Sequence, residues 1–360
     1  GLSKIQSIAE KKATLPALSF VLFEAKDTSL ILTATDMEVG IRVSLSAHIG
    51  LVGKMALPAK KLYDVVREFP NSEISFDIKE NFSIKISHKN IIFNLIGLDP
   101  DQFPSFPSIK EENLFSINSS ILKRMIDRTF FAMSNDESKY NLNGIFFHKI
   151  SLNDFIYIAA ISTDIHRLAF SKEIFENLGD SFLEKGVIIP KKGIMEIRKL
   201  IDNTENEIQM GFSGNNAIFT KENTKIIIRV IDGDFPEYQK VIPQMLDSYI
   251  SIPQDSFLKV LRRISTLTNE RHRGIRLTFS SQRLEVSAKN PELGEAKEEI
   301  PIEYEGEEIS IAYNARYLID AVMAYPTEFI QFQFKDNISP TVITPGENQN
   351  SFAVIMPMRL

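Results

Sequence analysis

The polar side chains of this 360-residue chain do not form a motif that would carry catalysis. There is no Walker loop, no GxGxxG and no GxSxG elbow. The absence of cysteine excludes disulfides, thiolate catalysis and cysteine-ligated zinc or iron–sulfur centres. The five histidines are scattered, with no HExxH pattern or i,i+4 pair to ligate a metal: His48, His88, His148, His166 and His272. We therefore expect no catalytic residue, no metal and no cofactor.

One segment places an acid and a histidine close enough to imagine a proton relay: Thr163-Asp164-Ile165-His166-Arg167-Leu168. No Ser or Cys nucleophile is tied to it. As an extended strand it would direct Asp164 and His166 to one face and Ile165 to the other. We favour a structural or partner-contacting role for this segment, and an enzyme of unknown class is the alternative.

The pattern of expected strands and helices repeats three times along the chain. Ala56-Leu57-Pro58, Ile188-Ile189-Pro190 and Ile311-Ala312-Tyr313 each end an apolar run and open a helical pattern, at spacings of 132 and 123 residues. Two further sets of landmarks recur in the same order: Ala34-Thr35-Asp36, Ser162-Thr163-Asp164 and Ala288-Lys289-Asn290, then Phe103-Pro104, Phe235-Pro236 and Met356-Pro357. A repeat of this length is a domain. The sequence predicts three similar domains, at residues 1–112, 113–246 and 247–360.

Within each repeat, short runs rich in Ile, Val and Phe alternate with turns, which predicts antiparallel sheets. Two amphipathic helical patterns interrupt the strands in each repeat. The expected helices cover residues 3–12, 59–67, 121–133, 190–200, 256–264 and 314–324. The fold class is therefore α+β, with two helices on one face of the sheets of each domain.

Charge divides between these elements. The formal net charge is −6, yet the six expected helices together carry +12 and the rest of the chain −18. If the helices share a face, that face would bind phosphates electrostatically and without regard to sequence. The alternative is that Lys and Arg are there as good helix formers on solvated faces.

The chain contains no apolar run of 18 residues and no signal peptide, so we expect a soluble globular protein in the cytoplasm. Its last residues, Phe352 to Leu360, form an apolar run where termini are normally polar. We expect Val354 and Ile355 in a final strand, with Met356 to Leu360 leaving it as one wall of an exposed groove.

Several motifs together resemble the bacterial DNA polymerase III β subunit, the sliding clamp, over about Thr14 to Leu360. They are the terminal Ile-Met-Pro-Met-Arg-Leu, the Thr163–Leu168 segment, Leu142-Asn143-Gly144, Ile231-Asp232-Gly233-Asp234-Phe235-Pro236-Glu237-Tyr238 and Asn290-Pro291-Glu292. The resemblance implies the DNA clamp fold, in which two chains join head to tail into a dimeric ring around duplex DNA. It also implies a non-catalytic role that tethers the replicative polymerase, with a separate clamp loader using ATP.

The resemblance further implies a groove between the second and third domains, called here the partner groove. Polymerase, clamp loader and repair proteins would insert a peptide similar to Gln-Leu-x-Leu-Phe there. The matching positions are Leu142, Thr163, Ile165, His166, Arg167, Leu168, Pro236, Lys240, Val241, His272, Asn314, Tyr317, Ile338, Pro340, Val354, Ile355, Met356, Pro357, Met358, Arg359 and Leu360. For the apolar members, the alternative is plain core packing.

Three of these positions depart from the family pattern. Ile165 stands where the motif usually has Gly, and a β-branched residue is strained at positive φ. If the backbone there is not left-handed, Ile165 simply narrows the groove. His272 replaces a residue that is often aromatic or apolar, and Pro340 one that is often small and polar.

By the same resemblance, two further sets of residues have roles. The DNA-binding positions are Lys12, Lys60, Asp136, Lys139, Tyr140 and Asn141, of which Asp136 is the weakest because a carboxylate repels phosphate. The dimer interface is Phe93 and Leu95 of one chain against Leu267 of the other. Family chains begin with a strand before the first helix, so we expect upstream residues to be missing. A monomeric peptide-binding scaffold that does not encircle DNA is the second alternative.

Overall fold

The structure is a computed structural model. It describes residues 1–9, 15–79, 81–106, 114–175, 183–201, 206–243, 249–268, 273–346 and 350–359. The chain divides into two compact units. Unit 1 comprises Gly1–Ser120 and Lys192–Val230, and unit 2 comprises Ile121–Lys191 and Ile231–Leu360.

The strand-to-helix transitions fall where the repeats predict them. Strand β4 ends at Pro58 and α2 begins at Ala59, β12 ends at Pro190 and α4 begins at Lys191, and β20 ends at Asn314 and α6 begins at Ala315. The α-helices are α1 (Leu2–Ile5), α2 (Ala59–Val66), α3 (Ser119–Thr129), α4 (Lys191–Ile201), α5 (Gln254–Ile264) and α6 (Ala315–Ala324). The last five lie within four residues of the expected bounds, whereas α1 ends at Ile5; residues 10–12 of the expected 3–12 helix lie outside the described part.

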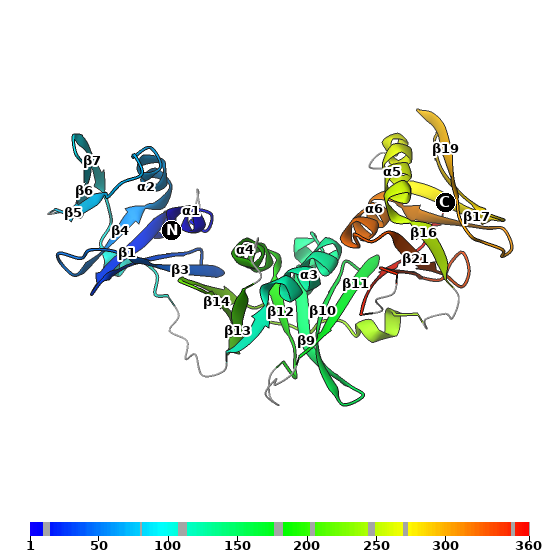
Figure 1. Cartoon of the computed structure of the whole chain (residues 1–360), viewed down its shortest axis with the longest axis horizontal. Helices are drawn as coiled ribbons and strands as arrows, with labels where there is room; N and C mark the ends of the chain where they lie inside the picture. The colour runs from blue at the N-terminus through cyan, green and yellow to red at the C-terminus, as the bar shows by residue number, and fades with distance from the viewer. Residues whose placement is uncertain are drawn as a thin grey trace. The chain divides into compact units, whose positions relative to one another are not determined.

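Unit 1 is built on one eight-stranded antiparallel sheet with α1 and α2 packed against its first strands (Figure 1). In spatial order its strands are β4 (Gly53–Pro58), β1 (Phe20–Lys26), β2 (Ser29–Thr35), β3 (Val39–Ser46), β15 (Thr224–Arg229), β14 (Asn216–Lys221), β13 (Glu207–Ser213) and β8 (Phe115–Asn118). A separate three-stranded sheet contains β5 (Ser75–Ile78), β6 (Ser83–His88) and β7 (Ile91–Ile96). Helix α4 from Lys192 onward and two 3-10 turns, Pro16–Ser19 and Pro100–Gln102, also belong to this unit.

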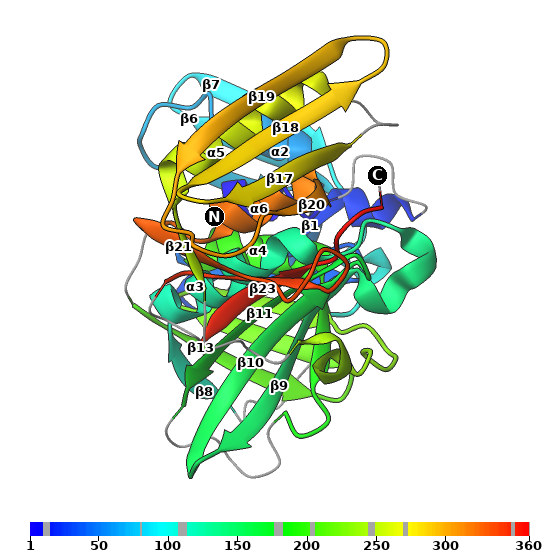
Figure 2. The same cartoon turned by 90° about the vertical axis from the view of Figure 1, so that its right-hand side faces the viewer.

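Unit 2 repeats this plan (Figure 2). Its eight-stranded sheet runs β12 (Val187–Pro190), β9 (Gly144–Leu152), β10 (Phe155–Thr163), β11 (Arg167–Ile174), β23 (Ser351–Ile355), β22 (Thr341–Thr344), β21 (Phe329–Gln333) and β16 (Ile250–Pro253). A four-stranded sheet runs β19 (Gly294–Pro301), β18 (Arg283–Asn290), β17 (Gly274–Ser280) and β20 (Ile309–Asn314). Its 3-10 turns are η3 (Phe130–Ala132), η4 (Glu137–Leu142), η5 (Tyr238–Val241) and η6 (Ser265–Leu267).

Each large sheet joins strands from two successive repeats at one antiparallel junction. In unit 1 the junction is β3 with β15, where Ile41 faces Ile226. In unit 2 it is β11 with β23, where Leu168 faces Val354. The sheets are therefore continuous across the expected domain boundaries.

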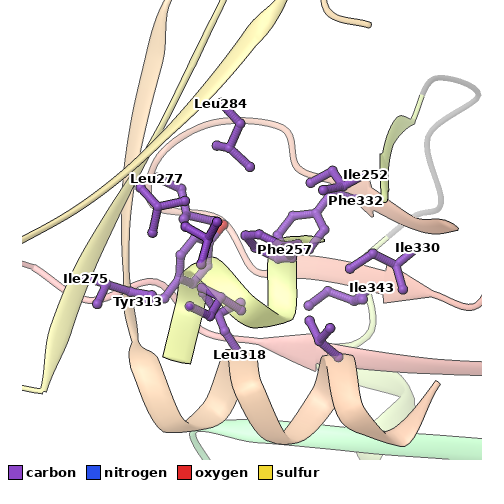
Figure 3. Close-up of a cluster of buried hydrophobic side chains, with 14 of the residues drawn as sticks. Ile252, Phe257, Ile275, Leu277, Leu284, Tyr313, Leu318, Ile330, Phe332 and Ile343 are labelled. Carbon is purple, nitrogen blue, oxygen red and sulfur yellow. The ribbon is translucent and has the colours of Figure 1, made fainter. Parts of the chain in front are cut away.

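Strand β23 contributes to two cores because successive side chains point to opposite faces. Ala353 and Ile355 join the large core formed with α5 and α6, whereas Phe352 and Val354 join a smaller cluster with Leu168 and other residues of the opposite face. Figure 3 shows the large core, in which Phe257 of α5 and Leu318 of α6 lie among the side chains of the strands. Truncating a fully buried ring such as Phe257 to Ala would cost about 3 to 5 kcal/mol of stability. The expected final strand is confirmed, and it ends at Ile355.

No helix in the described ranges is both long and apolar enough to cross a membrane.

Candidate functional site

The Thr163–Leu168 segment is a tight turn between β10 and β11, so the expectation of a continuous strand there is wrong. The Thr163 hydroxyl donates to the carbonyl of Arg167 at 2.7 Å and accepts from the amide of Ile165 at 3.1 Å. One carboxylate oxygen of Asp164 accepts from the amides of His166 and Arg167, both at 3.0 Å. Asp164 is therefore occupied in holding the turn, which removes the physical basis for an Asp–His relay.

Arg167 ties this turn to helix α6. Its side chain is only 7% exposed, and it forms ion pairs with Asp164 at 3.0 Å and Asp320 at 2.7 Å. The guanidinium also lies 4.4 Å from the centroid of the Tyr317 ring. A buried cation with two carboxylates and an aromatic face has one well-defined position. The turn and the helix consequently form one rigid wall, on which the exposed His166 ring stacks against Tyr317 at 6.3 Å.

The end of the chain continues from this wall. The Met356 amide donates to the carbonyl of His166 at 3.0 Å, and the Met358 amide donates to that of Ala312 at 2.7 Å. The side chains of Met356 and Met358 are 40% and 37% exposed. The backbone is thus pinned while two flexible apolar side chains face solvent.

A third part of the wall is the segment after Pro236. Tyr238 is buried in the same cluster as Leu168 and Val354, and its hydroxyl lies 2.7 Å from Nε2 of His148. The Phe235 ring stacks on Phe146 with centroids 4.8 Å apart. Burial lowers the pKa of His148 and raises the pKa of Tyr238 to about 12, so both groups are neutral near pH 7. These contacts present Val241 beside the cluster with half of its surface exposed.

Most of the predicted groove residues lie on these connected elements, but not all face solvent. Buried in the single chain are Leu142, Thr163, Arg167, Leu168, Asn314, Val354 and Ile355. Exposed are Ile165, His166, Pro236, Lys240, Val241, Ile338, Met356, Met358 and Arg359, while Tyr317, Pro340 and Pro357 are half-buried. His272 and Leu360 lie outside the described residues. Ile338 and Pro340 lie on a turn of their own, in which Asp336 accepts from the amides of Ile338 and Ser339.

Sequence reasoning missed two residues that build this site. Asp320 anchors Arg167 from 153 residues away, and Tyr238 carries the segment that presents Val241. Tyr238 could have been found from its place three residues after the Phe235 landmark. Asp320 lies three residues after Tyr317 on a helix, which places both on one face.

The predicted DNA-binding residues of the second repeat form one loop. Asp136 accepts hydrogen bonds from the amide and hydroxyl of Ser138 at 3.0 and 2.6 Å, and these bonds lower its pKa. Lys139 lies 3.6 Å from the same carboxylate, and the Asn141 side chain donates to the carbonyl of Asp234 at 3.0 Å. Tyr140 is 57% exposed. The carboxylate therefore organises the loop that displays Lys139 and Tyr140.

Lys60 is exposed on α2, and Lys12 lies outside the described residues. Two helical cations are held in ion pairs with carboxylates outside the helices, which the helix charge count does not include: Arg124 with Glu173 and Arg263 with Glu298. The basic helical surface is therefore smaller than the charge count of the sequence implies.

Of the predicted dimer-interface residues, Phe93 and Leu95 lie on strand β7 and Leu267 lies on the 3-10 turn η6. Strand β7 is an edge of its sheet, and four of its apolar side chains are exposed: Ile91, Ile92, Phe93 and Ile96. Leu95 is half-buried. Leu267 packs partly buried against the large core, and its carbonyl accepts from the Asn290 side chain at 3.0 Å. An exposed apolar edge strand is a surface that soluble proteins normally cover.

Within the described part of the chain, no three His, Asp or Glu side chains are grouped so as to hold a metal ion.

Comparison with known proteins assigns the chain to a family. Residues 1–107, 116–237 and 239–359 match the models of the N-terminal, central and C-terminal domains of the DNA polymerase III beta subunit. The beta sliding clamps of Caulobacter vibrioides and Pseudomonas aeruginosa are 32% and 33% identical to it, each over 100% of this chain and 96% of its own length.

Solved structures of other proteins support the same family assignment. The DNA polymerase III subunit beta from Pseudomonas aeruginosa superimposes with a TM-score of 0.93 at 31% identity. A sliding clamp from Bartonella birtlesii bound to griselimycin superimposes with a TM-score of 0.94 at 31% identity. Both matches cover 100% of this chain and 96% of the other. With the three-domain antiparallel fold, these matches show that the chain belongs to the bacterial DNA polymerase III beta subunit family, the beta sliding clamps.

Proposed function

We propose that two copies of the chain join head to tail into a ring that encircles duplex DNA without sequence specificity. The ring would tether the DNA polymerase III catalytic subunit in the cytoplasm. The clamp loader, other polymerases and repair proteins would dock on the same partner groove through Gln-Leu-x-Leu-Phe-like peptides. The three domains that we propose are residues 1–112, 113–246 and 247–360.

The family is a non-catalytic processivity factor, so the function lies in what the chain binds. The pattern of sheet junctions carries the ring proposal. Strands β3 and β11 are equivalent in the repeats, and each pairs with a strand of the next repeat, β15 or β23. The third-repeat counterpart of β3 and β11 is β19, and the first-repeat counterpart of β15 and β23 is β7.

Both β19 and β7 are sheet edges in the chain. Pairing β19 of one copy with β7 of another would continue the junction pattern and cover the exposed apolar row on β7. Such a contact joins different surfaces of the two copies, and it forms a ring when the rotation closes.

Charge supports the DNA role. Lys60 and Lys139 are long side chains on exposed elements, and they can follow phosphates without reading bases. A ring holds DNA by topology, so these contacts need only be weak and salt-sensitive. We propose that Asp136 contributes by shaping its loop and Lys12 by contacting phosphate.

The partner groove has the chemistry of a peptide site for several partners. Its exposed Met356, Met358 and Val241 side chains lie on a backbone that is fixed by hydrogen bonds. Flexible methionines adapt to different aliphatic and aromatic anchors.

Light scattering at micromolar concentration tests the ring interface. The wild type should have about twice the 40.9 kDa mass of one chain, and Phe93→Asp should have the mass of a monomer. A charge on β7 would have to be buried at the interface, which is strongly unfavourable. Phe155→Asp is the control, because Phe155 is also an exposed strand residue, at 53% against 40%, but belongs to β10 and not to the proposed interface strands β7 and β19. A wild-type monomer, or equal behaviour of the two variants, would refute the interface.

A further inference from the structure

The sheet junction of unit 1 repeats the backbone of the junction in unit 2. Its turn lies between β2 and β3, where the Thr35 hydroxyl accepts from the Met37 amide at 3.1 Å and Met37 has a φ of 77°. Beside this turn, the amide of Arg229 at the end of β15 donates to the carbonyl of Glu38 at 2.8 Å. The corresponding residues in unit 2 are Thr163, Ile165, Met356 and His166, with bonds of 3.1 and 3.0 Å and a φ of 78°. The backbone that carries the partner groove thus occurs a second time, in unit 1.

The side chains on this second copy leave a cavity of about 300 Å³, called here the first-junction cavity. Its lining includes Met37, Glu38, Asn215, Asn216, Ile227 and Arg229, all within unit 1. Gly40 pairs with Ile227 as Leu168 pairs with Val354 in unit 2, and the Phe106 ring lies over Gly40. The cavity combines apolar surface from Met37 and Ile227 with a cation, Arg229, at the position that Met356 has in the partner groove.

The charge of Arg229 is available to a ligand. Its side chain is exposed, and within the part of the chain that the structure describes its guanidinium has no ion-pair partner. Asn215 and Asn216 place side-chain amides in the same lining. A guanidinium with neighbouring amide donors matches the geometry of a carboxylate. The Glu38 carboxylate lines the cavity as well, so the attraction for an anion is modest.

We propose that the first-junction cavity is a second docking site, which takes an acidic peptide. An Asp or Glu side chain of the peptide would pair with Arg229, and an aliphatic neighbour would pack on Met37. The choice of a peptide rests on the docking function proposed above, since both sites have the same backbone walls. The exchange of Met356 for Arg229 separates the two sites by charge, so one site prefers apolar anchors and the other an acidic one.

Methyl NMR of the full-length protein with selectively labelled methionines tests the proposal, because both sites contain reporters. Met37 reports on the first-junction cavity, and Met356 and Met358 report on the partner groove. Single Met→Leu variants assign the signals. The probe is acetyl-Leu-Asp-Leu-amide, and acetyl-Leu-Asn-Leu-amide is its neutral twin. The acidic peptide should shift the Met37 signal saturably, with an affinity about threefold higher than that of the neutral one.

Variants at the two charges should act in opposite directions. Arg229→Gln should remove the preference for the acidic peptide, whereas Glu38→Gln should enlarge it. Arg67→Gln is the matched control, because it lowers the net charge equally and Arg67 is exposed on the same unit but does not line the cavity. It should leave the preference unchanged.

Three results would overturn the proposal. They are equal affinities of the two peptides at Met37, an equal loss of preference in Arg67→Gln, and a shift of Met356 and Met358 alone by the acidic peptide. Gln-Leu-Ser-Leu-Phe should shift Met356 and Met358 in the same protein. If it does while Met37 does not respond to the acidic peptide, only the second site fails. If it shifts neither signal, the docking function proposed above fails.

Discussion

Arg167 shows how one side chain fixes the turn and the helix that flank the proposed partner groove. It is almost fully buried between Asp164 of the turn and Asp320 of α6, and the Tyr317 ring covers it. The arrangement links the two backbone segments that flank the exposed apolar side chains. Removing the guanidinium would leave two partly buried carboxylates close to each other without their cation.

Arg167→Ala should therefore lower the free energy of unfolding by about 3 kcal/mol. Arg316→Ala is the matched control, since Arg316 lies 3.9 Å from the same Asp320 but is 75% exposed. A surface pair of this kind contributes less than about 1 kcal/mol. Urea denaturation of the two variants measures the difference, and equal losses would show that burial of the Arg167 pair does not matter.

At the residue scale, the sequence was a better guide to which positions of the repeats are equivalent than to their backbone conformation. The repeat of Thr-Asp at positions 35–36 and 163–164 marked equivalent places in two repeats. The expected conformation at the second place was an extended strand, and the structure instead has equivalent tight turns at both. The left-handed backbone at Ile165 was left open, because intrinsic preference opposes it. The Thr163 and Asp164 side chains accept hydrogen bonds from the amides of Ile165 and His166, and these bonds hold Ile165 at a φ of 78° against that preference. Bonds of this kind are not visible in a local sequence pattern.

At the scale of elements, the two sheet junctions differ in the residue three positions after the Phe of each Phe-Pro landmark. In unit 1 this residue is Phe106, whose ring lies over Gly40. A Cβ atom added to Gly40 would come within 2.7 Å of a ring carbon, and the Arg42 guanidinium carbon lies 4.4 Å from the ring centroid. In unit 2, the equivalent Tyr238 packs with Leu168 and Phe170. The first junction is thus covered by an aromatic ring and an arginine, whereas the second keeps an apolar cluster beside exposed Val241. This difference gives a physical reason for expecting an apolar groove at the second junction.

His148 makes the segment around Tyr238 sensitive to pH. Burial lowers the pKa of His148, so the folded state keeps it neutral below its ordinary pKa of about 6.5. Between that value and the lowered pKa the unfolded chain binds more protons, and stability must fall as the pH decreases. The free energy of unfolding should decline from about pH 7 to about pH 5, with a smaller slope in His148→Gln. Identical slopes by chemical denaturation would contradict this assignment.

The positions of helices and strands along the chain were the feature that the sequence predicted best. Three strand-to-helix transitions and the final strand follow from apolar runs ending before amphipathic patterns. The pairing of strands from different repeats was not predictable from periodicity, because register depends on contacts between segments far apart in sequence. The joining of β3 to β15 and of β11 to β23 came from the structure alone.

At the scale of the whole molecule, an acidic chain can hold DNA if attachment is topological. The net charge of −6 argues against tight binding through phosphate contacts alone. The ion pairs that occupy two helical cations reinforce this point. Weak, mobile contacts inside a closed ring would instead allow sliding, and only the ends of the DNA would permit escape.

The most direct measurement is retention of the protein on a linear duplex tethered by one end to a bead. The protein is added while the free end is open, and that end is then left open or blocked with a bulky bound protein. A wash at about 0.5 M salt screens phosphate contacts beyond a few ångströms. Encirclement predicts that protein stays on the blocked duplex and is lost from the open one, whereas equal loss from both would contradict the ring.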